Sequence, residues 1–276
     1  MSKHIDDKTT VVLNNGIEMP LLGLGVYKSG DDTYDAVRFA LDVGYRSIDT
    51  AALYGNEKAV GDAVRASGVN RNEVFITTKV WNDDLRAHTV RKACENSLKL
   101  LNLDYIDLYL IHWPVADEYI TAYSVMEELF HEQKIRTLGV SNFLPKHIET
   151  LLPKCEIVPA VDQLEIHPYL SNTTVIDFCH KLNIMPEAWA PLARGAVSRD
   201  LVISTIAEKH SKTPSQVALR WHLQRGEIVI PKSVHASRIL ENSKVFDFCL
   251  DGSDMALINA LDNNGRTGPD PDNFSL

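Results

Sequence analysis

Four side chains that together could protonate a carbonyl oxygen stand at or just after the ends of apolar stretches. Asp49 ends one such stretch, and Tyr54 follows five residues later, in the loop before the next helical pattern. Lys79 and His112 end the two stretches that come next. A lysine beside a carboxylate keeps its charge, and it lowers the pKa of a nearby phenol because it favours the phenolate. A histidine can orient the carbonyl oxygen or relay the proton.

Each of these residues also has a plain structural interpretation. Asp49 could cap the next helix, and Tyr54 could pack on its own loop. Lys79 could extend its stem out of the core, and His112 could be a core histidine bonded to the backbone. Since the four stand at successive strand ends, the sequence favours the joint interpretation. In that interpretation they form an acid–base set with Tyr54 as the acid.

Other reaction classes lack their sequence signatures. The chain has no H-E-x-x-H motif, and its first predicted strand lacks the His-x-His of barrel metallohydrolases, so we expect no metal site. Gly139-Val-Ser-Asn-Phe143 lacks the second glycine of a nucleophile elbow. Gly23-Leu-Gly25 lacks the third glycine of the Rossmann fingerprint. An acid without a nucleophile or a metal needs a hydride donor, so the sequence predicts a nicotinamide cofactor bound without a Rossmann fold.

The strongest phosphate-binding candidate lies late in the chain. Lys232 and Ser233 end the last predicted strand, where barrels of parallel strands often bind phosphate. Arg238, Glu241 and Asn242 then fall at i, i+3 and i+4, on one face of the following helix. Two cations, a hydroxyl group and a helix start suit a phosphate, whereas Glu and Asn suit the polar edge of adenine. The alternative is an ordinary solvated helix start, although cations there oppose the helix dipole unless an anion is present.

Length, composition and charge exclude several classes of protein. Of the 276 residues, 45% are hydrophobic and 24% are charged, as in soluble globular proteins with a sizeable core. The formal net charge of -9 argues against a nucleic-acid surface. The first residues lack the apolar core of a signal peptide and no apolar run approaches the length of a membrane span, so we expect neither. The four cysteines form no C-x-x-C pair. We therefore expect a cytoplasmic monomer with buried free thiols and with no nucleic-acid or membrane partner.

Eight apolar stretches alternate with helical patterns, which predicts one domain over residues 1–276, a single (β/α)8 TIM barrel of the α/β class. The predicted strands are Leu21–Tyr27, Tyr45–Thr50, Val74–Val80, Ile106–Trp113, Thr137–Ser141, Ala160–Glu165, Pro186–Ala190 and Ile228–Lys232. The predicted helices include Thr33–Val43, Asn56–Ala66, Ala87–Leu101, Ile120–Gln133, Lys146–Leu152, Thr174–Leu182, Leu201–His210, Ser215–Gln224, Ser237–Val245 and Ser253–Leu261. An N-terminal β-hairpin, Val11–Pro20, would turn at Asn15-Gly16 in a type I′ turn, and a short polar tail would end the chain.

A barrel of this kind carries its functional groups at the C-terminal ends of its strands. The strand ends after His112 hold a further set of polar and aromatic residues: Ser141, Asn142, Gln163, Glu165, His167, Trp189, Lys232 and Ser233. The predicted fold therefore brings the acid–base set and the phosphate-binding candidate to the same end of the barrel.

The chain resembles an aldo-keto reductase from end to end. The motifs that carry the resemblance are Gly44-Tyr-Arg-Ser-Ile-Asp-Thr-Ala51, Tyr54, Thr78-Lys79, Leu110-Ile-His-Trp-Pro114, Gly139-Val-Ser-Asn-Phe143 and Ile230-Pro-Lys-Ser233. The compact length is similar to that of the microbial and protozoal branch of the family, which includes 2,5-diketogluconate reductases, methylglyoxal reductases and prostaglandin F synthases.

The resemblance implies a role for each matching residue. Asp49, Tyr54, Lys79 and His112 would be catalytic, with Tyr54 as general acid. Tyr27, Trp81 and Trp113, with Tyr54 and His112, would form the substrate pocket, and Phe143 is a further candidate for its wall. NADPH would be held by Ser141, Asn142 and Gln163 at the nicotinamide carboxamide, Trp189 against its ring, Lys232, Ser233 and Arg238 at the 2′-phosphate, Glu241 and Asn242 at the adenine, and Gly25, Val26, Ala190, Pro191, Leu192, Arg194 and Val234 elsewhere.

Three positions depart from the family pattern. Asp162 stands where Asn is common, and the departure would affect hydrogen bonding beside the nicotinamide. Trp189 stands where longer members of the family have Tyr. Leu192-Ala-Arg-Gly195 stands where Leu-Gly-Gln-Gly is frequent, in the loop expected to cross the pyrophosphate, where Arg194 could clamp the cofactor. None of the three positions belongs to the catalytic four.

The activity implied by the resemblance is the NADPH-dependent reduction of aldehydes and reactive ketones, with a small carbonyl compound as the substrate. One alternative is a slowly turning NADPH sensor of the channel β-subunit kind, and another is a dedicated reductase of one keto sugar acid or of prostaglandin H2. The tail, Asp262–Leu276, is polar and too short to lay a large apolar cover over the barrel mouth. We therefore expect an open aromatic pocket with a broad range that includes methylglyoxal and aromatic aldehydes.

Overall fold

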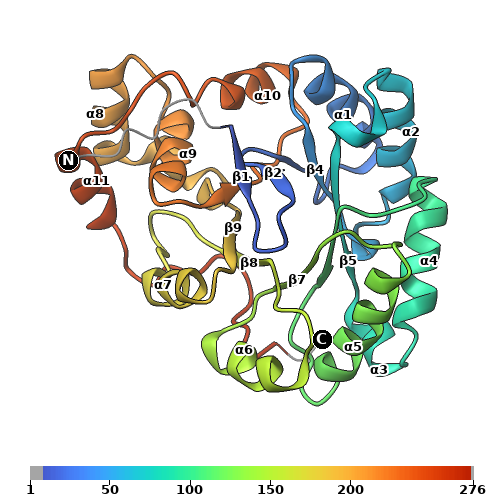
Figure 1. Cartoon of the computed structure of the whole chain (residues 1–276). Helices are drawn as coiled ribbons and strands as arrows, with labels where there is room; N and C mark the ends of the chain where they lie inside the picture. The colour runs from blue at the N-terminus through green and yellow to red at the C-terminus, as the bar shows by residue number, and fades with distance from the viewer. Residues whose placement is uncertain (1–8, 275–276) are drawn as a thin grey trace.

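Eight short strands run parallel to one another and form one curved sheet in the order of the chain. Bridges between Leu22 and Val229 and between Gly25 and Lys232 join the two edges of this sheet. The predicted barrel is therefore confirmed in the structure, a computed structural model that describes residues 9–274 (Figure 1). The strands are β3 (Leu24–Gly25), β4 (Ser47–Asp49), β5 (Phe75–Val80), β6 (Leu108–Ile111), β7 (Leu138–Ser141), β8 (Val161–Glu165), β9 (Met185–Trp189) and β10 (Ile228–Val229), preceded by an antiparallel hairpin of β1 (Thr10–Val12) and β2 (Glu18–Pro20).

The side chains inside the barrel change from apolar to polar along the strands. Every second residue of a strand faces the same way, so Phe75 and Lys79 of β5 lie on the same face. Phe75 packs in an apolar cluster with Leu13 and Met19 of the hairpin. Lys79, at the other end of the strand, is buried beside Asp49. Apolar packing therefore closes the N-terminal half of the barrel, and the polar groups gather in the C-terminal half.

Helices connect the strands and surround the sheet, as Figure 1 shows. They are α1 (Thr33–Asp42), α2 (Glu57–Ser67), α3 (Asn82–Arg86), α4 (Val90–Leu101), α5 (Tyr119–His131), α6 (Pro145–Leu151), α7 (Thr173–Lys181), α8 (Leu201–His210), α9 (Pro214–Gln224), α10 (Ala236–Ser243) and α11 (Gly252–Asn259). The prediction is wrong for Ala87–Leu101, which begins later, as α4, and follows the separate helix α3. The backbone turns between the two helices, because His88 adopts a φ of 53°.

The turn of the N-terminal hairpin differs from the predicted one. A type I′ turn at Asn15-Gly16 needs a positive φ at both residues, and only Gly16, at 83°, has one. The N–H of Gly16 instead bonds to the carbonyl of Leu13, as in a three-residue turn that ends on a left-handed glycine. The Asn15 amide reaches the carbonyl of Arg136 at 3.2 Å. A contact with the barrel thus helps to fix the turn, and such contacts are not visible in the local sequence.

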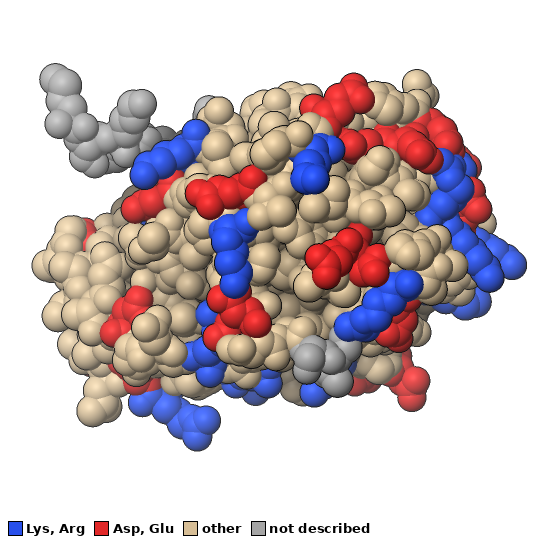
Figure 2. All heavy atoms as spheres, turned by 90° about the horizontal axis from the view of Figure 1, so that it is seen from below, with Lys and Arg blue, Asp and Glu red and all other residues tan. Residues whose placement is uncertain are grey.

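The cysteines, all within the described residues, form no disulfide bonds, and the face in Figure 2 carries charges of both signs. Acidic and basic side chains are interspersed on the face shown in Figure 2. Within residues 9–274, no helix has the length and apolar character needed to cross a membrane. All the cysteines are free, and Cys94 and Cys179 are buried as expected. The prediction of buried thiols is wrong for Cys155, which is half-buried, and for Cys249, which is exposed.

Helices α2 and α4 meet backbone to backbone at Gly61. A Cβ atom at this position would lie 2.1 Å from the carbonyl oxygen of Leu101, which is far inside van der Waals contact. Arg65 of α2 donates a hydrogen bond of 2.9 Å to the same oxygen. Because α2 begins three residues after Tyr54, this contact also positions the loop that carries that residue.

We expect Gly61→Ala to lower the free energy of unfolding by about 2 kcal/mol, since the added methyl group must push two helix backbones apart. The better helix propensity of alanine recovers only part of this loss. Gly252→Ala in α11 is the matched control, because a Cβ atom there meets nothing within 4 Å. Urea unfolding followed by circular dichroism measures both variants. Equal midpoints for the two would contradict the proposed close approach.

Candidate functional site

A buried ion pair lies in the polar half of the barrel. The Nζ atom of Lys79 is 2.7 Å from Oδ1 of Asp49 and 2.9 Å from the carbonyl oxygen of Thr50. The two charged side chains are 0% and 3% exposed. Burial lowers the pKa of Lys79, but the attraction of Asp49 and Tyr54 outweighs burial, so the pKa is raised overall. Lys79 therefore keeps its positive charge at neutral pH.

Tyr54 lies beside this ion pair, at the end of a short 3-10 helix, η2 (Ala52–Tyr54). The Nζ atom of Lys79 is 5.1 Å from the centroid of the Tyr54 ring. Burial raises the pKa of Tyr54 to about 12, and Lys79 opposes this rise. Lys79 thus acts in the predicted direction, but the predicted net lowering of the pKa is wrong because burial has the larger effect. The phenol consequently carries its proton at neutral pH.

His112 completes the predicted group of four. Its ring centroid is 5.8 Å from that of Tyr54 and 5.1 Å from that of Trp81, and both contacts are edge-to-face. Burial, helped by the nearby charge of Lys79, holds the pKa of His112 well below its usual value. Its Nδ1 atom is buried and has no hydrogen-bond partner among the described residues. His112 is therefore a neutral imidazole within reach of the same space as the phenol.

Asn142 links the ends of three strands beside this group. Its amide nitrogen donates to the carbonyl of His112, 3.0 Å away, after β6. Its amide oxygen accepts a hydrogen bond of 2.9 Å from Nε1 of Trp189, at the end of β9. Ser141, at the end of β7, donates to the backbone carbonyl of Gln163 at 2.9 Å. The structure thus brings four of the predicted cofactor-binding side chains together, although the Asn142 amide already has a protein partner at each end.

Asp162, the first departure from the family pattern, lies behind the sheet. Its Oδ1 atom faces the N–H of Phe143 at 3.4 Å, and its Oδ2 atom is 4.0 Å from the sulfur of Cys179 in α7. Burial raises the pKa of Asp162 well above its usual value. The side chain therefore points to the helix layer rather than into the barrel, where Gln163 points.

Glu187 is a member of the site that the sequence analysis missed. It is fully buried, and its Oε2 atom accepts a hydrogen bond of 2.7 Å from Nε2 of Gln163. The same Nε2 atom donates to Oδ2 of Asp49, also at 2.7 Å. Burial and the nearby charge of Asp49 raise the pKa of Glu187 to about 8. The alternation of β9 could have revealed it, since Glu187 stands two residues before Trp189 on the same face.

Aromatic side chains form a wall around the phenol and the imidazole. Tyr27 contacts Tyr54 at a centroid distance of 4.9 Å. Trp113 stacks on Phe274 at 4.0 Å, and Trp81 meets the same ring edge-on at 6.5 Å. Phe274 comes from the C-terminal tail and was not predicted. The wall thus contains the predicted residues Tyr27, Trp81 and Trp113 and, in addition, Phe274, which contacts the two tryptophans. Phe274 belongs to the C-terminal tail, the segment that was expected to leave the mouth open.

Phe143 does not belong to this wall, so the expectation that it could line the pocket is wrong. Its side chain is fully buried in the main core. The ring packs edge-to-face against Tyr119 of α5 at a centroid distance of 5.2 Å and against His147 of α6 at 5.8 Å. It therefore supports the loop after β7 from behind.

Glu165 anchors the C-terminal tail across the mouth of the barrel. Its carboxylate, at the end of β8, accepts hydrogen bonds from the backbone N–H groups of Thr267 at 2.6 Å and Gly268 at 3.1 Å. Gly268 lies against Trp189 so closely that a Cβ atom would come within 2.4 Å of the indole ring. The buried carboxylate of Glu165 therefore helps to hold the short polar tail over the site, together with the ion pair of 2.7 Å between Lys146 and Asp272. Ser275 and Leu276 lie outside the described residues.

The predicted phosphate-binding residues surround the start of α10. The bridge between Gly25 and Lys232 brings the end of the last strand beside the first strand. Ser233 is buried, and its hydroxyl accepts a hydrogen bond of 3.1 Å from the backbone N–H two residues later. Lys232 and Arg238 are exposed, and no acidic residue within 9–274 forms an ion pair with either cation. Two free cations at a helix start are consistent with an anion site.

The other residues predicted at the cofactor lie near the same helix or in the loop after β9. Glu241 accepts a hydrogen bond of 2.8 Å from the hydroxyl of Thr213, so its carboxylate is already in use within the protein. Asn242 is buried and Val234 is half-buried, and Val26 is buried beside β3. The structure thus places these residues near the predicted phosphate-binding residues. The carboxylate of Glu241, however, is less free to bind an adenine than the sequence suggested, because it already accepts a hydrogen bond.

The loop after β9 has an unusual backbone. Ala190, Ala193 and Arg194 adopt positive φ values of 50°, 46° and 52°, which are unfavourable for residues with a Cβ atom. Arg194 is exposed, Pro191 is buried and Leu192 is half-buried. The left-handed backbone at Ala193 explains why a glycine is frequent at this position in the family pattern.

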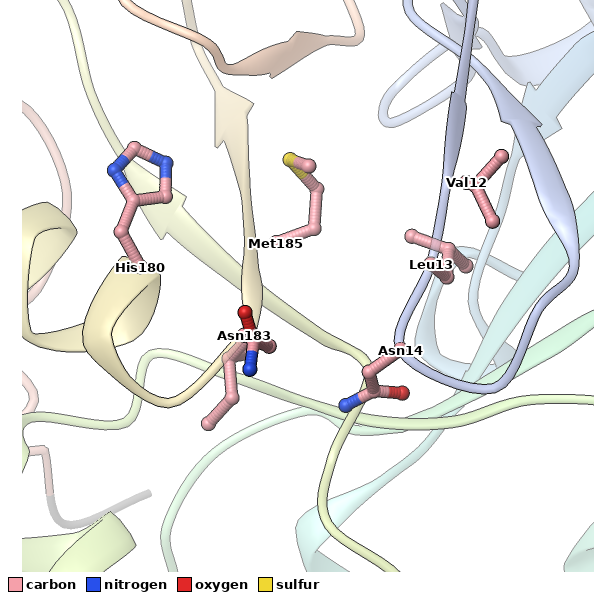
Figure 3. Close-up of a pocket in the computed structure, with 7 residues that line it drawn as sticks. Val12, Leu13, Asn14, His180, Asn183 and Met185 are labelled. Carbon is pink, nitrogen blue, oxygen red and sulfur yellow. The ribbon is translucent and has the colours of Figure 1, made fainter.

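Two pockets lie at the other end of the barrel and lack an acid–base set. One, of about 430 Å³, lies between the N-terminal hairpin and the segment that joins α7 to β9. Figure 3 shows its sides, with His180, Asn183 and Met185 facing Val12, Leu13 and Asn14. The other includes Tyr105 and Arg136, which precede β6 and β7. Within residues 9–274, no group of His, Cys, Asp and Glu side chains has a metal-binding arrangement. The candidate site is therefore the polar half of the barrel.

Comparisons with known proteins find relatives over nearly the whole chain. A model of the aldo/keto reductase family matches residues 21–263. Glyoxal reductase of Bacillus subtilis is 49% identical over 267 residues, which are 96% of this chain and 97% of that protein. Methylglyoxal reductase DkgA of Escherichia coli is 47% identical and covers 96% and 98%. A 9,11-endoperoxide prostaglandin H2 reductase of Trypanosoma cruzi is 46% identical and covers 96% and 95%.

Solved structures show the same architecture. An aldo-keto reductase enzyme from a Medee basin deep-sea metagenome library superposes with a TM-score of 0.94 at 43% identity, over 97% of this chain and 100% of that one. A mutant of Gox0644 in complex with NADPH superposes with a TM-score of 0.93 at 41% identity, over 98% and 100%.

The buried neutral state of His112 predicts a loss of stability in mild acid. Its pKa is depressed in the folded protein, whereas it is about 6.5 in an unfolded chain. Below pH 6.5 the unfolded chain binds a proton that the folded protein does not, so stability falls by up to about 1.4 kcal/mol per pH unit. Unfolding curves between pH 7 and 5 should be flatter for His112→Gln than for the unchanged chain. Parallel curves would mean that the imidazole does not resist protonation.

Proposed function

Because the chain belongs to the aldo/keto reductase family, and is therefore an oxidoreductase, we propose that it reduces aldehydes and reactive ketones to alcohols with NADPH. The observation that supports this most strongly is the buried pair of Lys79 and Asp49 beside the protonated phenol of Tyr54. A carbonyl that receives a hydride needs a proton on its oxygen, and a phenol beside a fixed cation is suited to give one. The relatives named glyoxal and methylglyoxal reductases favour small reactive carbonyls.

In the proposed reaction, the hydride that reaches the carbonyl carbon would come from NADPH when it is bound. Tyr54 donates its hydroxyl proton to the oxygen as negative charge develops on it. Lys79 then stabilises the phenolate that remains, and Asp49 keeps the lysine charged inside the barrel. His112, being neutral, can donate one hydrogen bond to the same carbonyl oxygen without competing for the proton.

The residues around the mouth support a nicotinamide cofactor and favour NADPH over NADH. We assign Gln163, Ser141 and Asn142 to the nicotinamide carboxamide, with Trp189 against the ring. Lys232 and Arg238 would hold the 2′-phosphate, because both cations lie exposed at a helix start and pair with no acidic residue in the described part of the chain. The remaining assignments follow the family pattern: Ser233 and Val234 at the phosphate, Glu241 and Asn242 at the adenine, Gly25 and Val26 beside β3, and Ala190, Pro191, Leu192 and Arg194 along the pyrophosphate.

The first prediction concerns the proton donor. Tyr54→Phe should bind NADPH as the unchanged enzyme does but lose most of kcat, since general acid catalysis contributes roughly 10²–10⁴-fold. Lys79→Met should also lower kcat. Stopped-flow absorbance at the nicotinamide band separates the chemical step from cofactor binding. Reduction of methylglyoxal by Tyr54→Phe at close to the original rate would exclude the mechanism.

The second prediction concerns cofactor choice. A charge-assisted hydrogen bond contributes about 1.5–3 kcal/mol, and solvent weakens it at exposed sites. With two cations available, NADPH should exceed NADH in kcat/KM by roughly 10²–10³, each factor of ten being about 1.4 kcal/mol. Arg238→Ala should reduce this preference about tenfold, whereas Lys244→Ala, at the other end of α10, should leave it unchanged. Equal use of both cofactors by the unchanged enzyme would mean an ordinary solvated helix start.

The third prediction concerns substrate range. An aromatic wall excludes water but offers few hydrogen bonds, and apolar contacts discriminate by only about 1–3 kcal/mol. Methylglyoxal and aromatic aldehydes should both be reduced, and simple ketones poorly. Phe274→Ala should lower kcat/KM for nitrobenzaldehyde more than for methylglyoxal, because the stacked ring extends the wall toward larger substrates. Activity confined to one sugar acid or to an endoperoxide would overturn the broad range.

A further inference from the structure

The amide of Gln163 is held between two carboxylic acids at the centre of the barrel. Its Nε2 atom is 2.7 Å from Oδ2 of Asp49 and 2.7 Å from Oε2 of Glu187. All three side chains are buried, with 2% of Gln163, 2% of Asp49 and none of Glu187 exposed. They stand on three different strands, Asp49 at the end of β4 and Gln163 and Glu187 within β8 and β9, so the barrel fixes their positions independently of the loops around its mouth.

The chemistry of these contacts fixes the direction of the amide. Asp49 is paired with Lys79 through its other oxygen, so it can only accept. The atom of Gln163 that faces it must therefore be the NH2 group rather than the carbonyl oxygen. That NH2 group has two hydrogens, and Asp49 and Glu187 use both. The Oε1 atom of Gln163 is left as the only part of the amide that can bind another group, and among residues 9–274 it has no hydrogen-bond partner.

We propose that Glu187 is a positioning residue for the hydride transfer. By taking the second N–H of Gln163, it leaves that amide able only to accept a hydrogen bond from the carboxamide NH2 of the nicotinamide. This inference rests on the proposed function, in which Gln163 contacts the carboxamide. The consequence is that the carboxamide can take only one of its two orientations at Gln163, and the orientation of the carboxamide helps to determine which face of the ring points to the substrate.

Asp49 alone could not impose this restriction. With a single acceptor, one N–H of Gln163 would remain free, and the amide could turn so that it offered either a donor or an acceptor to the cofactor. A second acceptor removes the free donor. The site therefore needs an acceptor at position 187, not a charge. Burial raises the pKa of Glu187 to about 8, which makes it largely neutral at pH 7. A neutral carboxyl group also avoids a second negative charge beside Asp49.

The probe is a pair of cofactors, NADPH and its reduced 3-acetylpyridine analogue, in which a methyl ketone replaces the carboxamide. The analogue keeps the carbonyl acceptor and lacks the N–H donor that Gln163 Oε1 would accept. Dissociation constants for both, measured by quenching of tryptophan fluorescence in the full-length protein, give an affinity ratio for each variant. Intrinsic differences between the cofactors cancel when ratios are compared across variants, and the readout does not depend on turnover.

Glu187→Leu should reduce the preference for NADPH over the analogue by about fivefold to tenfold, the value of one net hydrogen bond. Glu187→Gln presents a neutral acceptor at the same place and should keep the ratio within about twofold of the unchanged protein. Transfer from NADPH deuterated on one face of C4 should become less face-selective in Glu187→Leu and stay selective in Glu187→Gln. Gln163→Met should lose the preference as Glu187→Leu does, and it provides the test if the leucine variant does not fold.

Three results would overturn the proposal. If Glu187→Leu weakens both cofactors equally and leaves the ratio unchanged, the residue has only a structural role. If Glu187→Gln behaves like Glu187→Leu, a charge rather than an acceptor is required. If Gln163→Met keeps the preference, the amide does not contact the carboxamide. Failure of the proposed function looks different, since the unchanged protein would then bind neither cofactor or would reduce no carbonyl compound.

Discussion

The attraction between Lys79 and Asp49 inside the barrel is the interaction on which the rest of the site depends. A lone ammonium group at this depth would lose its proton, because burial disfavours the charged form. Paired with Asp49 and bonded to the carbonyl of Thr50, it stays charged. This one fixed charge then acts on both neighbours. It adds to the effect of burial in lowering the pKa of His112, and it opposes the rise that burial causes in the pKa of Tyr54.

The barrel supports this charge by dividing its interior in two. Apolar side chains such as Phe75 fill the half near the hairpin, and the polar network of Asp49, Gln163 and Glu187 occupies the half near the mouth. Each member of the network stands on a strand, so its position does not depend on loop motion. The C-terminal tail lies over this network. Glu165, at the end of β8, accepts hydrogen bonds from the tail, and the tail brings Phe274 to the aromatic wall.

The sequence predicted the barrel and the gathering of the four acid–base candidates at one end of it, because both follow from strand order, which short-range patterns reveal. It missed Glu187 because the residue acts from within a strand rather than from its tip. Phe274 was missed because the path of a polar tail depends on a distant carboxylate, Glu165. The shift in the pKa of Tyr54 was predicted in the wrong direction, because the effect of burial depends on how the side chain packs in the folded protein, which the sequence does not show. The hairpin turn was wrong for a similar reason, since contacts with the barrel contributed to it.

The apolar cluster that contains Leu13, Met19 and Phe75 closes the hairpin end of the barrel, and this determines how solvent reaches the polar half. It makes the barrel a blind-ended chamber, so water and protons reach Asp49 and Glu187 only through the mouth. The tail lies at that same opening, and under the proposed function the cofactor and the substrate enter there as well. A ligand seated in the mouth would then close the route by which solvent reaches the buried carboxyl group of Glu187. In that case the acidity of the solution acts on Glu187 between one catalytic cycle and the next.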